Sequence, residues 1–380
     1  MRSAAGSTAT LRPGLVVEQC WQRVPGGSAS YIVELARALE TTAGVDPVGL
    51  AAVHAGPPTA DQSLPGLTVT SFMLPRAVLY RAWNRMEGPR PEWIAPQLDV
   101  VHATTWAIPP TRLPLAVTVH DLAFQRDPSH FTARGVRYFR RALERVRKEA
   151  DVVIAPSEAT AADCRSAGIE DDRVHVIPHG VRSPEVDVAE VTRFRARHNL
   201  TRDVVLWCGT LEPRKNLRVV LAAYEHLLLS GTDLDLVIVG PAGWGGTADD
   251  VRTAVARMPA GRVHLLGRLD RQELHAAYAA ARVFCFPSLW EGFGMPVLEA
   301  MSHGTPVVTS RHTAMAEFSG DGALLVDPHD AVQVADAIAL AAHDAHDALA
   351  ASGRKIAQLH TWEHSADLHV AAYRAAIARA

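Results

Sequence analysis

Two stretches in the second half of the chain place charged side chains beside glycines. In the first, Gly209-Thr-Leu-Glu-Pro-Arg-Lys-Asn216, a glycine turn joins an expected strand to an expected helix, and Arg214 and Lys215 stand at that turn. Two adjacent cations beside a helix N-terminus suit a diphosphate, because a guanidinium binds two oxygens while an ammonium acts as a point charge. The alternative interpretation is a chance pair of exposed basic residues.

The second stretch, residues 282–310, has a pattern that predicts a strand, a glycine loop, a helix, a glycine stop and a strand. Gly292 and Gly294 leave the backbone bare where a helix N-terminus directs free N–H groups outward, which favours a phosphate or another anion. Glu291 and Glu299 bracket this anion site. Because a carboxylate opposes anion binding, we expect Glu291 to have another task, such as bonding the hydroxyls of a sugar.

The first half of the chain offers two weaker candidates. His120 lies at the end of an expected strand, where open α/β sheets bind ligands, so it is a candidate for bonding a sugar hydroxyl or steadying a reacting centre. The alternative is a packed or surface histidine followed by a helix-capping aspartate, Asp121. Gly26 and Gly27 open an expected helix in a Rossmann-like manner, although the pair lacks the full dinucleotide fingerprint and also fits a simple turn.

Alternating apolar strands and amphipathic helices must position these residues. We expect strands at 15–20, 48–53, 67–72, 99–102, 116–120, 150–155, 174–178, 204–208, 236–240, 263–267, 283–286 and 306–309, and helices at 28–40, 76–86, 134–148, 217–229, 270–280 and 297–301. This order predicts an α/β protein with two similar βαβ domains, at 1–181 and 182–360. The change of texture at the polar, acidic stretch 183–192 marks the boundary.

The composition is that of a soluble globular protein. Of its residues, 48% are apolar and 21% are charged. Its length of 380 residues is greater than one domain core usually accommodates and suits two domains. A net charge of −3 gives no general affinity for nucleic acid. The four cysteines lack CxxC spacing and indicate small buried hydrophobes in a reducing compartment. No apolar run approaches a membrane span and no signal-peptide pattern is present, so we expect a cytoplasmic protein.

Two further features are ambiguous. Residues 134–148 are expected to form a strongly basic helix, which suits peripheral contact with the inner face of an anionic membrane. We prefer the alternative that this helix presents an ordinary solvated face. Asp233-Leu-Asp235 has the form of a metal-binding Asp-x-Asp but precedes an expected strand, whereas a ligand site should follow one. We therefore expect no metal site.

Together, these motifs resemble the retaining nucleotide-sugar glycosyltransferases of family 4, which have the GT-B fold of two Rossmann-like domains facing a central cleft. The resemblance rests on residues 209–216 and on Glu291-Gly-Phe-Gly-Met-Pro-Val-Leu-Glu299, and it extends from Pro25-Gly-Gly27 through Thr118-Val-His-Asp121 to Leu325-Val-Asp-Pro328. It implies a hexosyltransferase whose donor substrate is a nucleoside diphosphate sugar, with no separate cofactor. Mannose from GDP-mannose is favoured, and the acceptor is a glycan, a lipid-linked or a small molecule. The segment 361–380 is expected to be a helix that packs back toward the N-terminal domain.

The family pattern also implies roles for individual residues. Arg214 and Lys215 would hold the donor diphosphate, Glu291 would contact the transferred sugar, Glu299 the nucleotide ribose, and His120 would lie near the reacting face. The expected catalytic residues are His120, Glu291, Arg214 and Lys215, and the expected donor-binding residues are Gly26, Gly27, Gly209, Arg214, Lys215, Glu291, Gly292, Phe293, Gly294 and Glu299.

Two other functions remain open from the sequence. A nucleotide-sugar epimerase of the same fold would need an acid and a base at the sugar C2, and no such pair stands out. A catalytically silent nucleotide-sugar binding protein would be expected to have lost Lys215, Glu291 or His120, and all three are present.

Overall fold

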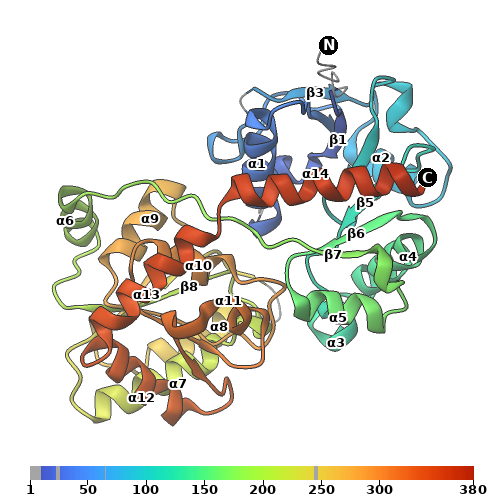
Figure 1. Ribbon diagram of the computed structural model, residues 1–380. Coiled ribbons are helices and arrows are strands. Elements are labelled where there is room, and N and C mark those ends of the chain that lie inside the picture. Colours follow the sequence, from blue (N-terminus) through green and yellow to red (C-terminus); the bar gives the residue numbers. More distant parts are fainter. Residues whose placement is uncertain (1–9, 23–25, 65, 244–246) are drawn as a thin grey trace, which may run out of the picture. The chain divides into compact units, whose positions relative to one another are not determined.

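The chain divides into two compact units in the computed structural model, which describes residues 10–22, 26–64, 66–243 and 247–380 (Figure 1). Unit 1 takes in the described residues up to Gly180 together with Trp362–Ala380, and unit 2 is Val181–Thr361. Within the described residues, no helix has both the length and the apolar character needed to cross a membrane.

Unit 1 is built on a parallel sheet whose described strands follow the order β3-β2-β1-β4-β5-β6-β7. The strands are β1 (Pro13–Val16), β2 (Val48–Ala51), β3 (Thr68–Ser71), β4 (Val100–Ala103), β5 (Leu115–Thr118), β6 (Val152–Ala155) and β7 (Val174–Val176). Because helices cover both faces, the central strands are buried on both sides and carry continuous apolar runs.

Two helical layers enclose this sheet. The helices are α1 (Gly26–Thr41), α2 (Arg76–Trp83), α3 (Ala123–Arg126), α4 (Ala133–Glu149), α5 (Glu158–Ser166) and α14 (Trp362–Arg379). The C-terminal α14, red in Figure 1, packs against α1 and against β4, β5 and β6. One core contains Tyr31 of α1 and Tyr373 of α14, while the core on the other face contains Trp83 of α2 and Leu143 of α4.

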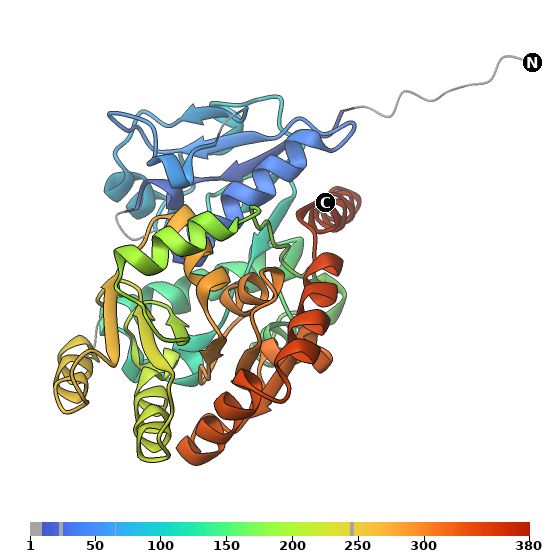
Figure 2. The ribbon, with the colours of Figure 1, turned by 90° about the vertical axis from the view of Figure 1, so that its left-hand side faces the viewer.

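Unit 2 repeats the plan with a parallel sheet of order β10-β9-β8-β11-β12-β13. Its strands are β8 (Val204–Cys208), β9 (Asp235–Val239), β10 (Val263–Gly267), β11 (Val283–Phe286), β12 (Val307–Ser310) and β13 (Ala323–Val326). The helices are α6 (Val188–Arg197), α7 (Leu217–Leu229), α8 (Thr247–Val255), α9 (Arg271–Ala280), α10 (Met295–Ser302), α11 (Ala314–Ser319), α12 (Ala331–Ala342) and α13 (His346–Leu359). The yellow-green α7 and the orange-red α12 run side by side (Figure 2).

The strand order reverses at one place in each sheet, between β1 and β4 in unit 1 and between β8 and β11 in unit 2. Doubly wound sheets bind ligands beyond the carboxyl ends of the strands at such a switch point. The residues that follow β1, β4, β8 and β11 are therefore the first places to look for a site.

The predicted α/β class with two Rossmann-like domains is confirmed, and several element bounds change. The expected strand 15–20 ends at Val16, and Glu18–Trp21 forms a turn of 3₁₀ helix instead. A turn of 3₁₀ helix, Pro213–Lys215, also separates β8 from α7, so Gly209 does not lead directly into a helix. All four cysteines are free and buried, as expected from their spacing.

Candidate active site

The switch point of unit 2 brings together the charged residues of the two sequence motifs. Arg214 and Lys215 lie in the loop after β8, and Glu291 lies in the loop after β11. These strands are neighbours in the sheet, with Val205 opposite Val283. Residues 76 positions apart in the sequence therefore meet at one edge of the sheet.

Glu291 forms ion pairs with both cations. Its Oε1 lies 2.6 Å from Lys215 Nζ, its Oε2 lies 3.0 Å from the Arg214 guanidinium, and Ser288 donates a hydrogen bond of 2.7 Å to Oε1. Arg214 also pairs with the buried carboxylate of Glu212 at 2.9 Å. The side chains of Glu291 and Lys215 are only 9% and 11% exposed, so solvent screens these ion pairs weakly.

The pKa shifts in this cluster follow from burial and from the neighbouring charges. Burial by itself would raise the pKa of Glu291, but Arg214, Lys215 and the hydrogen bonds from Lys215 and Ser288 lower it to about 2. Burial and the charge of Arg214 lower the pKa of Lys215, while Glu291 opposes that shift. Glu291 is therefore a carboxylate at neutral pH and cannot serve there as a general acid.

Backbone contacts between the two loops hold these side chains in place. The carbonyl oxygen of Arg214 accepts hydrogen bonds from Leu289 N at 2.8 Å and from Ser288 Oγ at 2.9 Å. Asn216 has a left-handed backbone with φ 54°, and its amide donates to the carbonyls of Pro287 at 3.0 Å and Pro328 at 2.7 Å. Asparagine tolerates this conformation better than most residues, so it can connect three loops at the N-terminus of α7.

The glycine loop adopts the predicted arrangement at the start of α10. Gly294 is the residue before the helix, with φ 102°, and a Cβ there would lie 2.3 Å from Met315 Cγ. Pro296 occupies the first turn, where its missing N–H removes no helical hydrogen bond. Gly292 and Phe293 are buried, and the Phe293 ring stacks on Phe318 with centroids 4.9 Å apart. Gly294 cannot carry a side chain without displacing Met315.

Glu299 lies on α10 and is partly buried. Its Oε2 accepts a hydrogen bond of 2.9 Å from the hydroxyl of Tyr278 on α9. Burial raises the pKa of Tyr278 well above its ordinary value, and the nearby groups Cys208 and Glu299 raise it further. Tyr278 is therefore a neutral donor that orients Glu299.

Gly209 takes part in the sheet rather than in a helix N-terminus. Its N–H donates to the carbonyl of Val239 at 2.9 Å. A Cβ on the neighbouring Gly240 would lie 1.9 Å from the carbonyl oxygen of Gly209, so the two backbones approach closely. Its amide is thus already used by a neighbouring strand.

The remaining predicted residues belong to unit 1. His120 follows β5 and is partly exposed, and its Nε2 donates to the carbonyl of Thr104 at 2.9 Å. Burial lowers the pKa of His120, although the Thr104 carbonyl and Asp121 oppose the shift. In the neutral ring Nδ1 is then an acceptor. Gly26, with φ 63°, and Gly27 begin α1, while residues 23–25 lie outside the described part of the chain.

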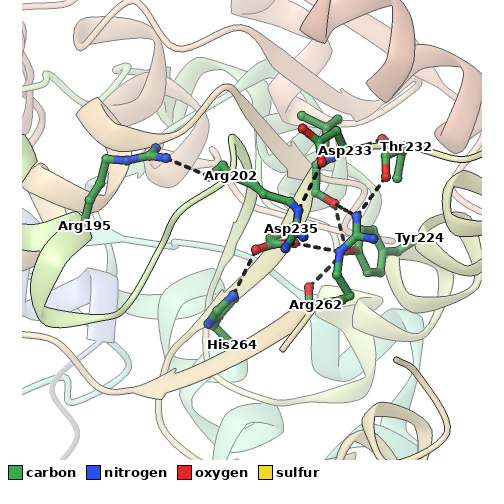
Figure 3. A network of polar contacts seen from close by, with 9 residues as sticks. Arg195, Arg202, Tyr224, Thr232, Asp233, Asp235, Arg262 and His264 are labelled. Atoms are coloured by element: carbon green, nitrogen blue, oxygen red, sulfur yellow. Dashed lines mark hydrogen bonds and ion pairs between the residues drawn. The ribbon is translucent and has the colours of Figure 1, made fainter. Parts of the chain in front are cut away.

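The Asp-x-Asp sequence belongs to an ion-pair network at the beginning of β9 (Figure 3). Asp235 is buried and pairs with Arg262 at 2.8 Å and with His264 at 3.3 Å, while Asp233 pairs with Arg202 at 3.0 Å. Figure 3 shows Arg262 and His264 directed at Asp235, while Arg202 contacts Asp233. No group of three or more His, Cys, Asp or Glu side chains that could hold a metal ion occurs among the described residues.

The basic helix is α4, and its arginines differ in their surroundings. Arg134, Arg137, Arg140 and Arg141 are exposed. Arg145 turns inward instead, where it pairs with Glu149 at 2.5 Å and donates to the carbonyl of Trp83 at 3.0 Å. Arg145 therefore has a structural role within unit 1.

Several residues of this site were absent from the sequence-based set. Ser288, Glu212 and Tyr278 contact the predicted residues, and Asn216, next to Lys215, binds the carbonyls of Pro287 and Pro328. Glu212 and Asn216 stand inside the predicted motif, and Ser288 lies two residues after the predicted strand 283–286, so their positions carried a signal. Tyr278 gave none, because its contact with Glu299 depends on how α9 and α10 pack.

Two family models match the chain, and each falls in one half. Residues 25–183 match the model described as Glycosyltransferase Family 4, and residues 188–357 match Glycosyl transferases group 1. The O-antigen chain mannosyltransferase B of Escherichia coli is 30% identical over 316 residues, which cover 80% of this chain and 82% of that protein. The MMP alpha-(1->4)-mannosyltransferase of Mycolicibacterium hassiacum is 28% identical, with 81% and 77% covered. A D-inositol 3-phosphate glycosyltransferase of Nocardioides sp. is 29% identical, with 92% and 85% covered.

Solved structures agree on the fold. Anabaena HepE in complex with UDP and glucose superposes with a TM-score of 0.74 at 18% identity, covering 95% of this chain and 98% of that chain. Sucrose-phosphate synthase from Thermosynechococcus elongatus gives a TM-score of 0.76 at 23% identity, covering 96% and 98%. The two Rossmann-like units thus have the GT-B fold. The chain belongs to glycosyltransferase family 4 and is a transferase enzyme.

Proposed function

We propose that this enzyme transfers a hexosyl group from a nucleoside diphosphate sugar to an acceptor hydroxyl, with retention of the anomeric configuration and without a metal ion. The contact of Arg214 and Lys215 with Glu291, at the carboxyl ends of β8 and β11, carries this proposal. The two cations suit the donor diphosphate, and the carboxylate beside them suits the hydroxyls of the sugar attached to it.

Donor binding would exchange partners within the cluster. Two cations and two carboxylates face one another in Arg214, Lys215, Glu212 and Glu291. When phosphate oxygens take the place of the Glu291 carboxylate at Arg214 and Lys215, the carboxylate becomes free to accept hydrogen bonds from the sugar. Glu291 enters this exchange as a carboxylate, because Arg214 and Lys215 lower its pKa to about 2, and a carboxylate accepts hydrogen bonds.

In the transfer step, the bond between the anomeric carbon and the phosphate oxygen breaks, and its electron pair stays on the diphosphate. Arg214 and Lys215 stabilise the negative charge that develops there, assisted by the N-terminal end of α10. The acceptor oxygen bonds to the anomeric carbon from the face that the diphosphate leaves, and the acceptor proton passes to the departing diphosphate. No enzyme nucleophile is needed in this scheme.

Two further residues have orienting roles in the proposal. Glu299, held by Tyr278, would accept hydrogen bonds from the nucleotide ribose. His120 has its Nε2 proton engaged by Thr104, so it would offer Nδ1 as an acceptor to a donor sugar hydroxyl. It would orient the sugar without acting as a base.

Mannose from GDP-mannose is the proposed donor. Support comes from relatives that are named as mannosyltransferases in Escherichia coli and Mycolicibacterium hassiacum. A glucosyl donor with UDP is the competing choice, because Anabaena HepE binds UDP-glucose on the same fold. The bases differ in their hydrogen-bonding edges, so nucleotide affinity separates the two.

The decisive experiment measures nucleotide release from GDP-mannose, UDP-glucose and related donors, each with and without a panel of acceptors. We expect acceptor-dependent release with GDP-mannose. Interconversion of two nucleotide sugars without release would indicate an epimerase instead. Binding without any reaction would indicate a catalytically silent protein.

The same reaction tests the metal and the stereochemistry. We expect full activity in EDTA and, by proton NMR, a product linkage with the anomeric configuration of the donor. Activity that EDTA abolishes and Mg²⁺ restores would contradict metal independence. An inverted anomeric coupling would contradict retention.

A further inference from the structure

The switch point of unit 1 contains a buried carboxylate that the proposed donor chemistry does not use. Glu18 stands two residues after β1, and its side chain is 0% exposed. Its Oε2 accepts hydrogen bonds from Ala52 N at 2.8 Å and from His54 Nε2 at 2.9 Å. Residues at this edge are where a parallel sheet of this order binds ligands.

Thr104 places Glu18 on the same sheet edge as His120. The hydroxyl of Thr104, directly after β4, donates to the carbonyl of Val16, and its own carbonyl accepts from His120 Nε2 at 2.9 Å. The ends of β1, β4 and β5 are thereby joined. The carboxylate thus shares an edge with the residue that we propose contacts the donor sugar.

Glu18 is poorly satisfied as a purely structural residue. Its Oε1 is buried and has no hydrogen-bond partner among the described residues. An unpaired buried polar atom destabilises the folded state, more so when it is charged, so it calls for an explanation other than folding stability.

His54 connects the buried carboxylate of Glu18 to the protein surface. A carboxylate only accepts hydrogen bonds, so the Nε2 of His54 bears the proton, and in the neutral ring Nδ1 is an acceptor. The His54 side chain is 21% exposed and stacks on Trp21, with centroids 4.6 Å apart and an interplanar angle of 6°. Trp21 is fixed in turn by a hydrogen bond of 2.9 Å from its Nε1 to the carbonyl of Gly56.

We propose that Glu18, His54 and Trp21 form the acceptor subsite, in which His54 Nδ1 accepts a hydrogen bond from a hydroxyl of a neutral sugar beside the Trp21 ring. This inference rests on the transferase function proposed above. His54 and Trp21 contact the acceptor, and Glu18 is a positioning residue that fixes the tautomer and orientation of the imidazole. Paired aromatic and acceptor groups suit a pyranose, which offers both C–H and O–H groups.

The charge of the subsite selects among acceptors. With His54 neutral, the carboxylate of Glu18 gives the subsite a negative charge, which repels an anion. A phosphorylated acceptor gains nothing from such a site. We therefore expect neutral glycosides to be preferred over sugar phosphates here.

The test uses the full chain with methyl α-mannopyranoside and mannose 6-phosphate as acceptor probes. Steady-state kinetics and saturation-transfer NMR are measured for the wild type, His54→Gln, Trp21→Ala and Glu18→Gln. His175→Gln, on β7 at the far side of the same sheet, is the matched control. We expect His54→Gln to raise the acceptor KM tenfold or more, with the donor KM and acceptor-independent nucleotide release within twofold of the wild type.

For Glu18→Gln we expect a raised acceptor KM with unchanged donor binding, a split that a general loss of structure would not produce. If Glu18→Gln fails to fold, the partly exposed His54 still decides the question. Unchanged acceptor KM and unchanged NMR contacts in His54→Gln would overturn the inference while leaving the transferase function intact. If the wild type bound no donor, the proposed function would be contradicted. The NMR contacts of the glycoside would then still show whether it binds at His54 and Trp21. Tighter binding of mannose 6-phosphate than of the neutral glycoside would also overturn it.

Discussion

The two units share one sheet topology but differ in whether the polar groups beside the sheet are charged or neutral. In unit 2, two cations and two carboxylates meet beyond β8 and β11. In unit 1, histidines, tyrosines and a threonine form a hydrogen-bonded chain between the sheet and α14. The same fold therefore supports a charged site in one half and a neutral one in the other.

The direction of each hydrogen bond in this chain of neutral side chains follows from the bond at its end, between His369 and Ser365. His369 Nδ1 donates to the backbone carbonyl of Ser365 at 2.7 Å, so in the neutral ring its Nε2 must accept. The hydroxyl of Tyr31 is the donor to that nitrogen, at 2.8 Å. Tyr31 Oη then accepts from the hydroxyl of Thr118, at 2.9 Å.

The chain continues to the second contact with α14. Because the Thr118 proton points to Tyr31, its oxygen accepts from His102 Nε2 at 2.7 Å. His102 Nδ1 is then an acceptor for the hydroxyl of Tyr373, at 2.8 Å. Each of these hydrogen bonds has one donor and one acceptor. A second proton on His102 or His369 would therefore make two donors face each other in one bond.

The two units depend on unprotonated groups of different charge, neutral histidines in unit 1 and an ionised glutamate in unit 2. Burial lowers the pKa of His369 to about 4 and that of His102 well below its ordinary value, which keeps both rings neutral. In unit 2 the pKa of Glu291 is lowered to about 2, which keeps its charge. Acid should therefore disturb the two sites in different pH ranges.

The largest expected effect is the loss of stability of unit 1 in acid. Five described histidines of unit 1 have a folded-state pKa below the ordinary 6.5, so the unfolded chain takes up protons first as the pH falls from 6.5 toward about 4; they are His102, His120, His175, His179 and His369. Each such histidine removes at most about 1.4 kcal/mol per pH unit in this range, and the partly exposed His175 removes less because solvent screens its charge. Unit 2 has two, His275 and His303, and should lose stability less steeply.

The Glu291 contribution is also lost in acid, but in a lower pH range. Its stabilisation is present above pH 4.5 and is lost as the pH falls toward about 2. Pulsed hydrogen exchange at a fixed labelling pH, after incubation at pH 7, 5.5 and 4.5, should show opening of α14 before α10. Opening of α10 first would contradict the expectation that unit 1 loses stability at a higher pH than unit 2.

The next largest effect is expected at Lys215. One charge-assisted contact to phosphate contributes about 1.5–3 kcal/mol, so Lys215→Ala should weaken GDP or UDP binding tenfold or more in calorimetry. Lys355→Ala, an exposed lysine of α13 in the same unit, should have no effect. Unchanged affinity in Lys215→Ala would remove this lysine from the donor site.

The two glutamates of unit 2 should separate binding from transfer. Glu299→Gln should mainly lower the affinity for the bare nucleotide, because Glu299 is proposed to face the ribose. Glu291→Gln should mainly lower turnover, because Glu291 is proposed to face the sugar. Calorimetry and turnover measured on both variants check this, and equal proportional losses in both quantities would sink the division of roles.

A smaller effect is expected from Tyr373→Phe in the neutral chain. This change removes the donor to His102 Nδ1 and should lower the free energy of unfolding by about 1–2 kcal/mol without altering nucleotide binding. Tyr138→Phe is the matched control, because that hydroxyl donates to the partly solvated carbonyl of Trp106. Urea denaturation measures both, and an equal loss in the two variants would argue against a special role for the chain.

The smallest effect is expected at the surface of α4. Arg137, Arg140 and Arg141 are exposed, so a lipid-binding face would sediment with anionic vesicles at low salt and dissociate as salt increases. We prefer a solvated face and expect little co-sedimentation. Salt-sensitive binding that is lost when the three arginines become glutamines, and kept in Arg145→Gln, would establish a membrane contact.

The repeating architecture and the two charged motifs could be read from the sequence. The runs 204–208 and 217–229 are strand and helix within the predicted bounds, because buried parallel strands and apolar helix faces leave periodic patterns. The glycine at position 294 and the charged residues of the two motifs were visible because their types are unusual beside a strand end. The end of β1 was placed too late, since the apolar residues Leu15, Val16 and Val17 give no sign that pairing with β2 stops at Val16.

The tertiary structure alone decided which distant residues meet. Glu18 and His54 are 36 residues apart, and Tyr31 and His369 are 338 apart, so no local pattern links them. Their contacts exist because the sheet order places β1 beside β2 and because α14 packs against α1 and the central strands. Hydrogen-bond partners, burial and the resulting pKa shifts follow from that packing, and a sequence pattern with short periods cannot encode them.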